Sequence, residues 1–292
     1  MLTSLNELLH NASLANYAVG AFNVYNLEGI KAVLGAAEAE HSPVILQLHP
    51  SAFHFHGTAL LTACLESAKD SCIPTLVHLD HATKAADIEW ALHHGITSIM
   101  ADGSQGSSED NLEFTGRMAS LARQYGAATE AELGRLSGSE DGLSVPEYKA
   151  RLTDPYMAVN FVEQTRVDAL AVCIGNVHGH YRGDPNLDFD RLKCIQELVS
   201  VPLVLHGASG LSDTLVHRAI DLGVRKFNVN TEVRGAYLAA LRASLQMERK
   251  PDLIEIMNGV VQAMQAVVVS KLRLFRSSGQ AWRRSIHWKD FP

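Results

Sequence analysis

The chain is poor in several features that would point to other classes of protein. Its four cysteines, Cys64, Cys72, Cys173 and Cys194, are scattered without CxxC spacing. This argues against a cysteine zinc site and against disulfides, and it favours reduced thiols in or near the core. No apolar run approaches the roughly 20 residues that cross a bilayer. No basic segment followed by an apolar core stands at the N-terminus, and no GxGxxG motif follows the first apolar run.

An excess of positive charge is also absent. The 292 residues carry 25 Lys and Arg against 32 Asp and Glu, for a net charge of −7. Such a chain has no general electrostatic attraction for nucleic acid, so we expect no nucleic-acid partner. We likewise expect no membrane partner and a cytoplasmic location. The hydrophobic share of 47% is ordinary for a folded chain with one large α/β domain or two small ones.

Eight short apolar segments alternate with helical patterns. Each is near-continuously apolar and ends in polar or glycine residues, which is typical of strands buried on both faces of a parallel sheet. The predicted strands are 17–24, 43–49, 75–81, 98–104, 127–134, 169–175, 202–209 and 226–232. Helical spacing recurs in 27–41, 85–95, 112–126, 156–165, 190–199 and 214–223. A βα unit repeated eight times predicts a (β/α)8 TIM barrel, an α/β fold, with an open doubly wound sheet as the alternative.

Two segments fall outside this repeat. Residues 134–150 form a long loop rich in Gly and Ser, and such loops in compact domains are usually functional or disordered. Residues 252–275 predict an additional C-terminal helix. We therefore expect a barrel domain over 1–280. The tail 281–292 shows no clear period and is interpreted as a frayed or docked segment.

Polar and ionisable side chains gather at the carboxyl ends of the predicted strands, which is where a (β/α)8 barrel carries its active site. In chain order they are Asp80, His81, Asp102, Glu132, His178, His206, Asn228 and Asn230. Such groups are costly to bury unless they are paired or bind a metal. Three histidines from three strand ends can form a catalytic zinc site with an open fourth position. The alternative is that each is a separate, hydrogen-bonded histidine at the barrel rim.

Other histidines compete as metal ligands, because the chain has 14 of them. His49, His54 and His56 cluster after the second predicted strand. His178 and His180 form an HxH pair in the segment after the sixth predicted strand. At most one of that pair is expected to bind a metal.

Two loops predict an anion site. HGASG (206–210) follows the seventh predicted strand and NVNT (228–231) ends the eighth, where this barrel habitually binds phosphate. Small residues there let backbone N–H groups approach an anion closely.

The loop 134–150 adds Glu140 and Asp141. A carboxylate on such a loop can act as a general base, the alternative being a solvated acidic loop.

Together these segments resemble the class II, zinc-dependent ketose-bisphosphate aldolases. The similarity covers about residues 1–280, through YAVGAFNVYNLE (17–28), HLDHATK (78–84), SIMADGS (98–104), EAELGRLSGSEDG (130–142), IGNVHGHY (174–181), PLVLHGASG (202–210) and KFNVNTE (226–232). HLDHATK and ELGRLSG are closest to the tagatose-bisphosphate aldolase branch. The resemblance implies reversible aldol cleavage of a ketose 1,6-bisphosphate, tagatose in preference to fructose 1,6-bisphosphate, to dihydroxyacetone phosphate and glyceraldehyde 3-phosphate.

The resemblance also implies residue roles. The zinc ligands would be His81, His178 and His206, with Asp102 and Glu132 at an alternative or second metal position. Asp80 would be the proton donor to the aldehyde oxygen, Glu140 the base toward dihydroxyacetone phosphate, and Asn228 a hydrogen-bond donor to the developing charge. Substrate contacts would come from Gly179, Gly207, Ala208, Ser209, Asn228, Val229, Asn230 and Thr231. A sodium or potassium ion near the phosphate, and a homodimer or homotetramer, are further implications.

Two positions depart from the family's pattern. His49 stands where a small polar residue is usual, and Asn258 stands where tagatose and some fructose enzymes carry an arginine for the distal phosphate. An amide replaces a bidentate guanidinium poorly, although Arg273 or Arg276 could substitute. The alternative is therefore an aldolase for a ketose 1-phosphate or a deoxy sugar-acid phosphate. Outside the enzyme class, the alternative is an accessory subunit of an aldolase complex. A Schiff-base enzyme is not indicated, because Lys226 only opens the eighth strand.

Overall fold

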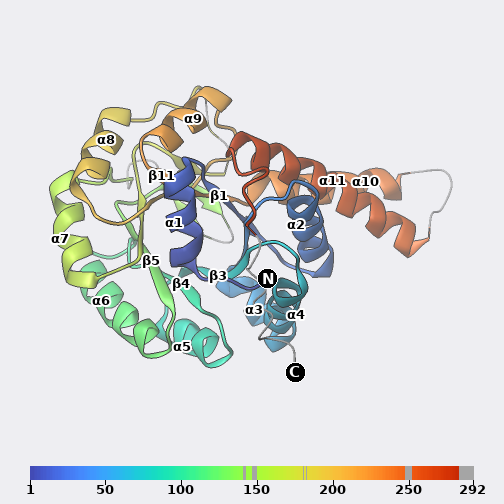
Figure 1. The fold of residues 1–292 in the computed structure, drawn as a ribbon, viewed down its shortest axis with the longest axis horizontal. Coiled ribbons are helices and arrows are strands. Elements are labelled where there is room, and N and C mark those ends of the chain that lie inside the picture. Colours follow the sequence, from blue (N-terminus) through green and yellow to red (C-terminus); the bar gives the residue numbers. More distant parts are fainter. Residues whose placement is uncertain (141–142, 147–149, 180, 182, 247–251, 283–292) are drawn as a thin grey trace.

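A closed ring of eight parallel strands forms the centre of the computed structural model (Figure 1). In order around the ring the strands are β1 (Val19–Asn23), β11 (Val224–Val229), β10 (Leu203–Leu205), β8 (Ala169–Val172), β5 (Ala128–Leu133), β4 (Ser98–Ala101), β3 (Thr75–Ala82) and β2 (Val44–Leu48). All eight predicted strands are present, so the (β/α)8 prediction is confirmed. The structure describes residues 1–292 except 141–142, 147–149, 180, 182, 247–251 and 283–292, and leaves out the side chains of 139, 140, 143 and 144.

Helices follow every strand of the ring and cover its outside (Figure 1). They are α2 (Leu27–Ala39), α3 (Pro50–His56), α4 (Thr58–Asp70), α5 (Ala85–His93), α6 (Ser108–Gln124), α7 (Pro155–Thr165), α8 (Phe189–Leu198), α9 (Asp213–Asp221) and α10 (Thr231–Leu245). Their starting points follow from local sequence. The side chains of Asn26, Ser107 and Asp154 each accept a hydrogen bond from a first-turn N–H, which satisfies donors that a helix leaves open.

Helix α1 (Leu5–Ala15) closes the amino-terminal end of the barrel and crosses the centre of the ring in Figure 1. Its buried face packs on residues at the starts of the strands. This second core cluster includes Leu5, Leu8, Leu9, Ala12, Tyr17, Val19, Ile45, Leu76, Ala128 and Ala169. This helix was not predicted from the sequence. Because it fills one end with apolar side chains, the polar strand residues face the opposite, carboxyl end.

Helix α11 (Leu253–Leu274) returns from the end of α10, and the two project together from the barrel (Figure 1). It confirms the helix predicted at 252–275. Its 22 residues include an 18-residue stretch with a mean hydropathy of 1.4. By length and composition the helix could therefore cross a membrane, and no such segment was predicted from the sequence. However, Val260, Val268 and Leu272 are buried against the rest of the chain, and Phe275, just after the helix, stacks on Phe227 of β11. We therefore interpret α11 as a covering helix.

The chain remains tied to the barrel just beyond α11. Gly279 N donates to the carbonyl of Glu40, and Ala281 N donates to the carbonyl of His41. Trp282 packs against the core cluster around α1. The rest of the predicted tail, 283–292, lies outside the described residues.

The predicted loop 134–150 contains two strands, which corrects that expectation. β6 (Ser137–Glu140) pairs antiparallel with β7 (Leu143–Val145) and parallel with β9 (Val177–His178). Gly138 faces His178 with φ 111°, and a Cβ there would overlap the His178 carbonyl oxygen. Only glycine suits this position. The Gly- and Ser-rich composition concealed the hairpin, because its partner β9 lies far along the chain.

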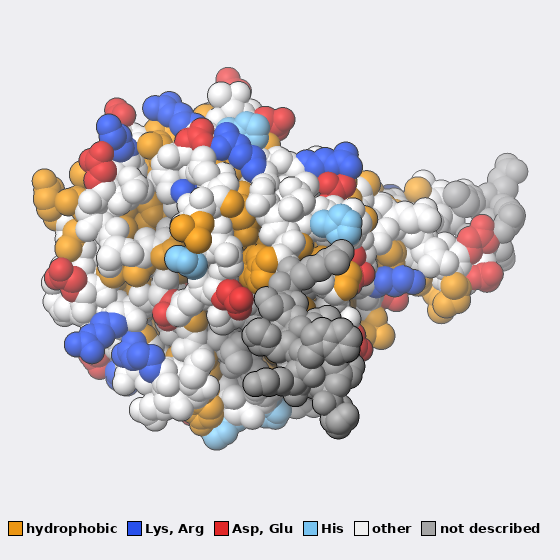
Figure 2. Space-filling view, viewed as in Figure 1, with side chains coloured by type: hydrophobic (Ala, Val, Ile, Leu, Met, Phe, Trp, Pro, Cys, Tyr) orange, Lys and Arg blue, Asp and Glu red, His pale blue; other side chains and the backbone are white. Residues whose placement is uncertain are grey.

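Acidic and basic side chains are interspersed over the molecular face in Figure 2. They do not gather there into a basic patch. This distribution agrees with the net charge of −7 and gives that face no concentration of positive charge that would attract a polyanion.

Candidate active site

Three imidazoles meet at the carboxyl end of the barrel. His81 lies on β3, His206 directly follows β10, and His178 lies on β9 in the segment after β8. Their candidate ligand nitrogens are all within 4.8 Å of one another, the one such group within the described part of the chain. The ring centroids of His81 lie 4.7 Å from His206 and 5.1 Å from His178. The structure thus brings together the three histidines that the sequence analysis assigned to zinc.

The competing histidines lie elsewhere. His54 Nε2 is 2.9 Å from Asp87 Oδ1, and its side chain is 51% exposed. His49 caps α3, with Nδ1 2.8 Å from Ser51 Oγ. His180 lies outside the described residues. Neither His49 nor His54 belongs to the group of three.

An irregularity in β3 turns both Asp80 and His81 toward the barrel mouth. Adjacent residues of a regular strand point to opposite faces. Here the pairing of β3 with β4 shifts register between Leu79 and Ala82, and His81 has a left-handed φ of 46°. That conformation is uncommon for a residue other than glycine. The shift acts as a bulge that re-aims side chains, and both Asp80 and His81 are buried.

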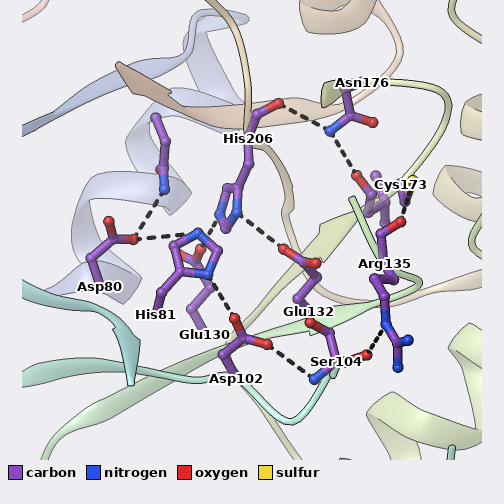
Figure 3. Close-up of polar contacts among 12 residues, drawn as sticks. Asp80, His81, Asp102, Ser104, Glu130, Glu132, Arg135, Cys173, Asn176 and His206 are labelled. Carbon is purple, nitrogen blue, oxygen red and sulfur yellow. Dashed lines mark hydrogen bonds and ion pairs between the residues drawn. The ribbon is translucent and has the colours of Figure 1, made fainter. Parts of the chain in front are cut away.

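Carboxylates hold two of the three imidazoles (Figure 3). His81 Nδ1 is 2.7 Å from Asp102 Oδ2, and Asp102 Oδ1 accepts from the Ser104 amide. His206 Nε2 is 3.0 Å from Glu130 Oε1, while its Nδ1 is 3.2 Å from Glu132 Oε2. For His81, the carboxylate on Nδ1 fixes the tautomer and leaves Nε2 for a metal. Asp102, predicted as an alternative metal ligand, is here the hydrogen-bond partner of His81.

The imidazoles respond differently to their surroundings. Burial alone would lower the pKa of His81, but the charge of Asp80 and the hydrogen bond to Asp102 outweigh it and raise that pKa well above its usual value. The pKa of His206 is also raised, because its carboxylate hydrogen bonds outweigh burial. Burial and the neighbouring histidines lower the pKa of His178 to about 3. Without a metal, the cluster therefore mixes charged and neutral rings.

The charge balance of the pocket fits a divalent cation. The buried ionisable groups around the histidines are Asp80, Asp102, Glu130, Glu132 and Lys226. With the imidazoles neutral, as metal binding requires, four carboxylates against one ammonium leave a surplus of negative charge. Buried charges are stable only when paired or bound to a metal. Three imidazoles with an open fourth position are also the usual donors for catalytic zinc, so the residues present fit this ion.

Two amides hold the carboxylate of Asp80. Asn23 Nδ2 donates to Oδ2 at 2.8 Å, and Asn228 Nδ2 donates to Oδ1 at 3.2 Å. Burial would raise the pKa of Asp80, but the charges of His81 and Lys226 outweigh it and lower that pKa to about 2. Asp80 is therefore an ionised carboxylate beside the three histidines, able to accept a proton from a substrate hydroxyl.

Lys226 and Glu130 form an ion pair in the centre of the barrel. Both side chains are fully buried, with Lys226 Nζ 2.8 Å from Glu130 Oε2 and 2.7 Å from Asn228 Oδ1. Lys226 stands in the middle of β11, which corrects the expectation that it opens the strand. Neither residue was predicted from the sequence to have a role in the site. Period-two spacing offered the available signal, since 130 and 132, like 226 and 228, lie on one face of a strand.

The two predicted anion loops lie beside each other at the same end. β10 ends at Leu205, so residues 206–210 form a turn rather than the predicted strand. Gly207 has φ 67°, and a Cβ there would overlap the Val177 carbonyl oxygen, so the turn passes closely under β9. The hydroxyl of Tyr181 donates to the Gly207 carbonyl at 3.0 Å. This turn therefore has a defined shape and is anchored to the segment that carries His178.

The other anion loop begins a helix. β11 ends at Val229, earlier than predicted, Asn230 is the N-cap of α10, and Thr231 is its first residue. A helix N-terminus presents unpaired N–H groups and positive dipole density to an anion. The side chains of Ala208, Ser209 and Val229 are buried, so contacts from these positions would come mainly from the backbone. Gly179, with φ 85°, is buried on the loop after β9.

The remaining predicted positions are more distant or only partly described. Glu140 ends β6, whose pairing with β9 joins its strand to His178, but its side chain lies outside the described residues. Asn258 is exposed in the first turns of α11 and lines a shallow depression there. Arg273 pairs with Glu40 at 2.7 Å and Arg276 with a carboxylate of α9 at 2.6 Å. Both candidate substitutes for the phosphate arginine are thus engaged on the outside of the barrel.

Comparisons with known proteins agree with this geometry. Residues 3–280 match the family described as fructose-bisphosphate aldolase class-II. A fructose-bisphosphate aldolase of Thermus caldophilus is 39% identical over 305 residues, which cover 96% of this chain and 100% of that protein. The crystal structure of the YdjI aldolase from Escherichia coli K12 is 34% identical, has a TM-score of 0.86, and covers 97% of this chain and 100% of its own.

A fructose-bisphosphate aldolase structure from Campylobacter jejuni shares the fold. Its TM-score is 0.77 at 24% identity, and it covers 96% of this chain and 97% of its own. Together with the family match over residues 3–280, these likenesses agree with the barrel described above. This chain therefore belongs to the class II fructose-bisphosphate aldolase family and is an aldolase, a carbon–carbon lyase.

Proposed function

We propose that this aldolase cleaves a ketose phosphate reversibly to dihydroxyacetone phosphate and an aldehyde, with zinc held by His81, His178 and His206. The observation that carries the proposal is the convergence of these imidazoles, within 4.8 Å, in a pocket with surplus negative charge beside two anion loops. Zinc bound there supplies Lewis-acid polarisation of the substrate carbonyl. Asp102 orients His81, and both Asp102 and Glu132, the latter beside His206, keep their proposed role as alternative metal contacts.

The phosphate of the substrate lies, in this proposal, between the two anion loops. The backbone N–H groups of Gly207, Ala208 and Ser209 face it from one side. Asn230 and Thr231, at the N-terminus of α10, face it from the other, where the helix dipole favours an anion. Gly179 and Val229 complete the backbone contacts. A sodium or potassium ion near the phosphate is part of the proposal, and its test is the dependence of activity on the monovalent salt supplied.

The protein residues move the protons. In the cleavage direction Asp80, already ionised, accepts the proton of the hydroxyl on the carbon that becomes the aldehyde. The adjacent carbon–carbon bond breaks, and its electron pair moves onto the dihydroxyacetone phosphate half. Asn228 donates a hydrogen bond to the developing negative charge. Glu140 then returns a proton to carbon. In the condensation direction Glu140 is the base and Asp80 the proton donor.

On the aldehyde side we propose tagatose 1,6-bisphosphate in preference to fructose 1,6-bisphosphate, with glyceraldehyde 3-phosphate as the second product. The support is the resemblance of residues 78–84 and 132–138 to the tagatose branch. One observation favours the alternative, a ketose 1-phosphate or a deoxy sugar-acid phosphate. Asn258 carries an amide, and Arg273 and Arg276 are paired with surface carboxylates, so none of these three positions offers an unoccupied guanidinium to a distal phosphate.

A substrate panel tests the proposal. Release of dihydroxyacetone phosphate is measured from the tagatose and fructose bisphosphates, from their 1-phosphates and from a deoxy sugar-acid phosphate. We expect activity to disappear with a chelator, to return with zinc, and to be highest for tagatose 1,6-bisphosphate. His81→Ala should abolish turnover, whereas His54→Ala, which removes an imidazole paired with a surface carboxylate, should not. Absence of product from every compound with zinc supplied would refute the proposal.

We further propose a cytoplasmic homodimer or homotetramer. The pair of helices α10 and α11 exposes Leu238, Leu245, Leu253 and Ile254, each at least 55% exposed. Apolar side chains exposed in this way are typical of surfaces that a second copy covers. Light scattering of the purified protein, compared with an Ile254→Glu variant, measures the assembly. A monomeric wild-type chain would contradict this part of the proposal.

A further inference from the structure

A lysine with no assigned role lies in the centre of the barrel. The side chain of Lys226 is 0% exposed, which is rare for lysine and requires partners. Its ammonium contacts two partners within the described residues, Glu130 and Asn228. Nζ lies 3.0 Å from Glu130 Oε1 and 2.8 Å from Glu130 Oε2, and it donates to Asn228 Oδ1 at 2.7 Å. The lysine therefore bridges two residues that each lead to the reaction centre.

The first branch leads to a metal ligand. Glu130 Oε1 is also 3.0 Å from Nε2 of His206, so one carboxylate group holds both the imidazole and the ammonium. Without Lys226, and with His206 neutral as a metal ligand, this carboxylate would remain buried with no full positive charge beside it, and an unpaired buried charge is strongly destabilising. On this branch Lys226 balances charge.

The second branch sets the direction of an amide. The side chain of Asn228 has an accepting oxygen and a donating nitrogen, and the ammonium of Lys226 can only donate. The oxygen must therefore face Lys226, and a flipped amide would place N–H groups against the ammonium. The nitrogen consequently faces Asp80, where Asn228 Nδ2 lies 3.2 Å from Oδ1. On this branch Lys226 fixes which end of the amide faces the reacting groups.

We infer that Lys226 is a positioning residue: it holds the Asn228 amide with its N–H side toward the charge that develops on the substrate, and it balances Glu130 behind His206. The inference rests on the proposed role of Asn228. Lys226 does not act as a Schiff-base nucleophile here, because its Nζ is already occupied by contacts to Glu130 and Asn228. Lys226 affects the reaction by orienting the Asn228 amide before any substrate binds.

The test uses a charge-balanced double variant. Lys226→Met alone leaves Glu130 uncompensated and is expected to fold poorly. Lys226→Met combined with Glu130→Gln removes both charges, and the glutamine oxygen still accepts from Nε2 of His206. We expect this double variant to fold. Its zinc affinity, measured by chelator competition, should stay within about tenfold of the wild-type value, because complete loss of a carboxylate partner of a metal-binding imidazole costs about 10–100-fold. We expect kcat to fall about 100-fold with little change in KM, as for a lost transition-state donor.

A double-mutant cycle separates orientation from a merely structural role. In an Asn228→Ala background the amide is gone, so the charge-balanced double change should cause no further loss in kcat. An equal loss in both backgrounds, or an unchanged kcat in the double variant, would overturn the inference. Full activity of Asn228→Ala alone would instead refute the proposed role of Asn228, so the two failures are distinguishable.

A second readout needs neither zinc nor turnover. In ¹⁵N-labelled, zinc-free protein the side-chain amide resonance of Asn228 is assigned by its disappearance in Asn228→Ala. Loss of the ammonium at position 226 should shift and broaden this resonance, because the amide can then flip. A sharp, unshifted resonance in the charge-balanced double variant would contradict the inference.

Discussion

The hydrogen bond between His81 and Asp102 provides the most direct test of how the metal site is held. It spans 2.7 Å between two side chains that are 7% and 3% exposed. Asp102→Ala would leave a ring N–H buried without its acceptor. A hydrogen bond to a charged group contributes about 1.5–3 kcal/mol, and about 1.4 kcal/mol corresponds to a factor of ten. We therefore expect the zinc dissociation constant to rise about 10–100-fold, which agrees with the usual effect of removing such a partner.

Competition with a chromophoric zinc chelator measures this change at fixed pH. Asp102→Asn keeps an acceptor oxygen but loses the charge, so its affinity should lie between those of wild type and Asp102→Ala. Asp87→Ala is the matched control. Asp87 also pairs with an imidazole, that of His54 at 2.9 Å, but away from the three histidines. Its removal should leave zinc affinity unchanged.

Two results would refute this reasoning. If Asp102→Ala bound zinc as tightly as wild type, the orientation of His81 would not depend on the carboxylate. If Asp102→Asn lost as much affinity as Asp102→Ala, the charge itself, through direct ligation, would be the contribution that matters. The second result would favour the alternative role of Asp102, as a metal ligand.

Three further predictions concern the rest of the chain. Gly138→Ala should cost about 1–3 kcal/mol of local strain, because φ is 111° and its Cβ would overlap the His178 carbonyl. Zinc affinity and kcat should both fall in this variant. The control Gly116→Ala, with open space around the added Cβ, should change neither. Phe275→Ala should lower the free energy of unfolding by about 3–5 kcal/mol in urea titrations, since the ring is fully buried, and a loss below about 1 kcal/mol would contradict its packing role. Glu40→Gln tests stability in acid. Hydrogen bonds from an arginine and a serine lower the pKa of Glu40 below 4.5. The stabilisation that ionised Glu40 gives the folded state is therefore present above that pH and is lost as the pH falls through the lowered pKa. The difference in Tm between wild type and Glu40→Gln should therefore shrink in acid, and a difference independent of pH would count against it.

The strands were predictable because their composition is dictated by burial on both faces. Every residue of β2, Val44–Leu48, is buried, and the run is apolar except for Gln47. The same uniform burial hides which residues point into the barrel. In β5 all six residues from Ala128 to Leu133 are buried, so no contrast with solvent marks Glu130 as inward-facing. The cluster of three histidines was accessible from sequence, whereas only the period-two spacing of 130/132 and 226/228 marked the ion pair beneath it.

Elements that depend on distant partners were harder to predict. Helix α1 has apolar residues at helical spacing, but its function of closing the barrel follows only from contacts with strands far along the chain, such as Ala128 and Ala169. The hairpin of β6 and β7 has little apolar content, and β9 stabilises it across about 40 residues of chain. His81 needed a left-handed φ that its sequence context does not indicate.

Closure of the amino-terminal end by α1 has a consequence for the lifetime of the loaded enzyme. With Leu5, Leu8 and Leu9 filling that end, the proposed zinc, the substrate and both products would use the opening beside the turn 206–210 and the start of α10. A substrate seated over the histidines stands in the path by which the ion leaves. Turnover at high substrate concentration should therefore slow the loss of the metal, so that the working enzyme is protected and the idle enzyme is the one that a chelator strips.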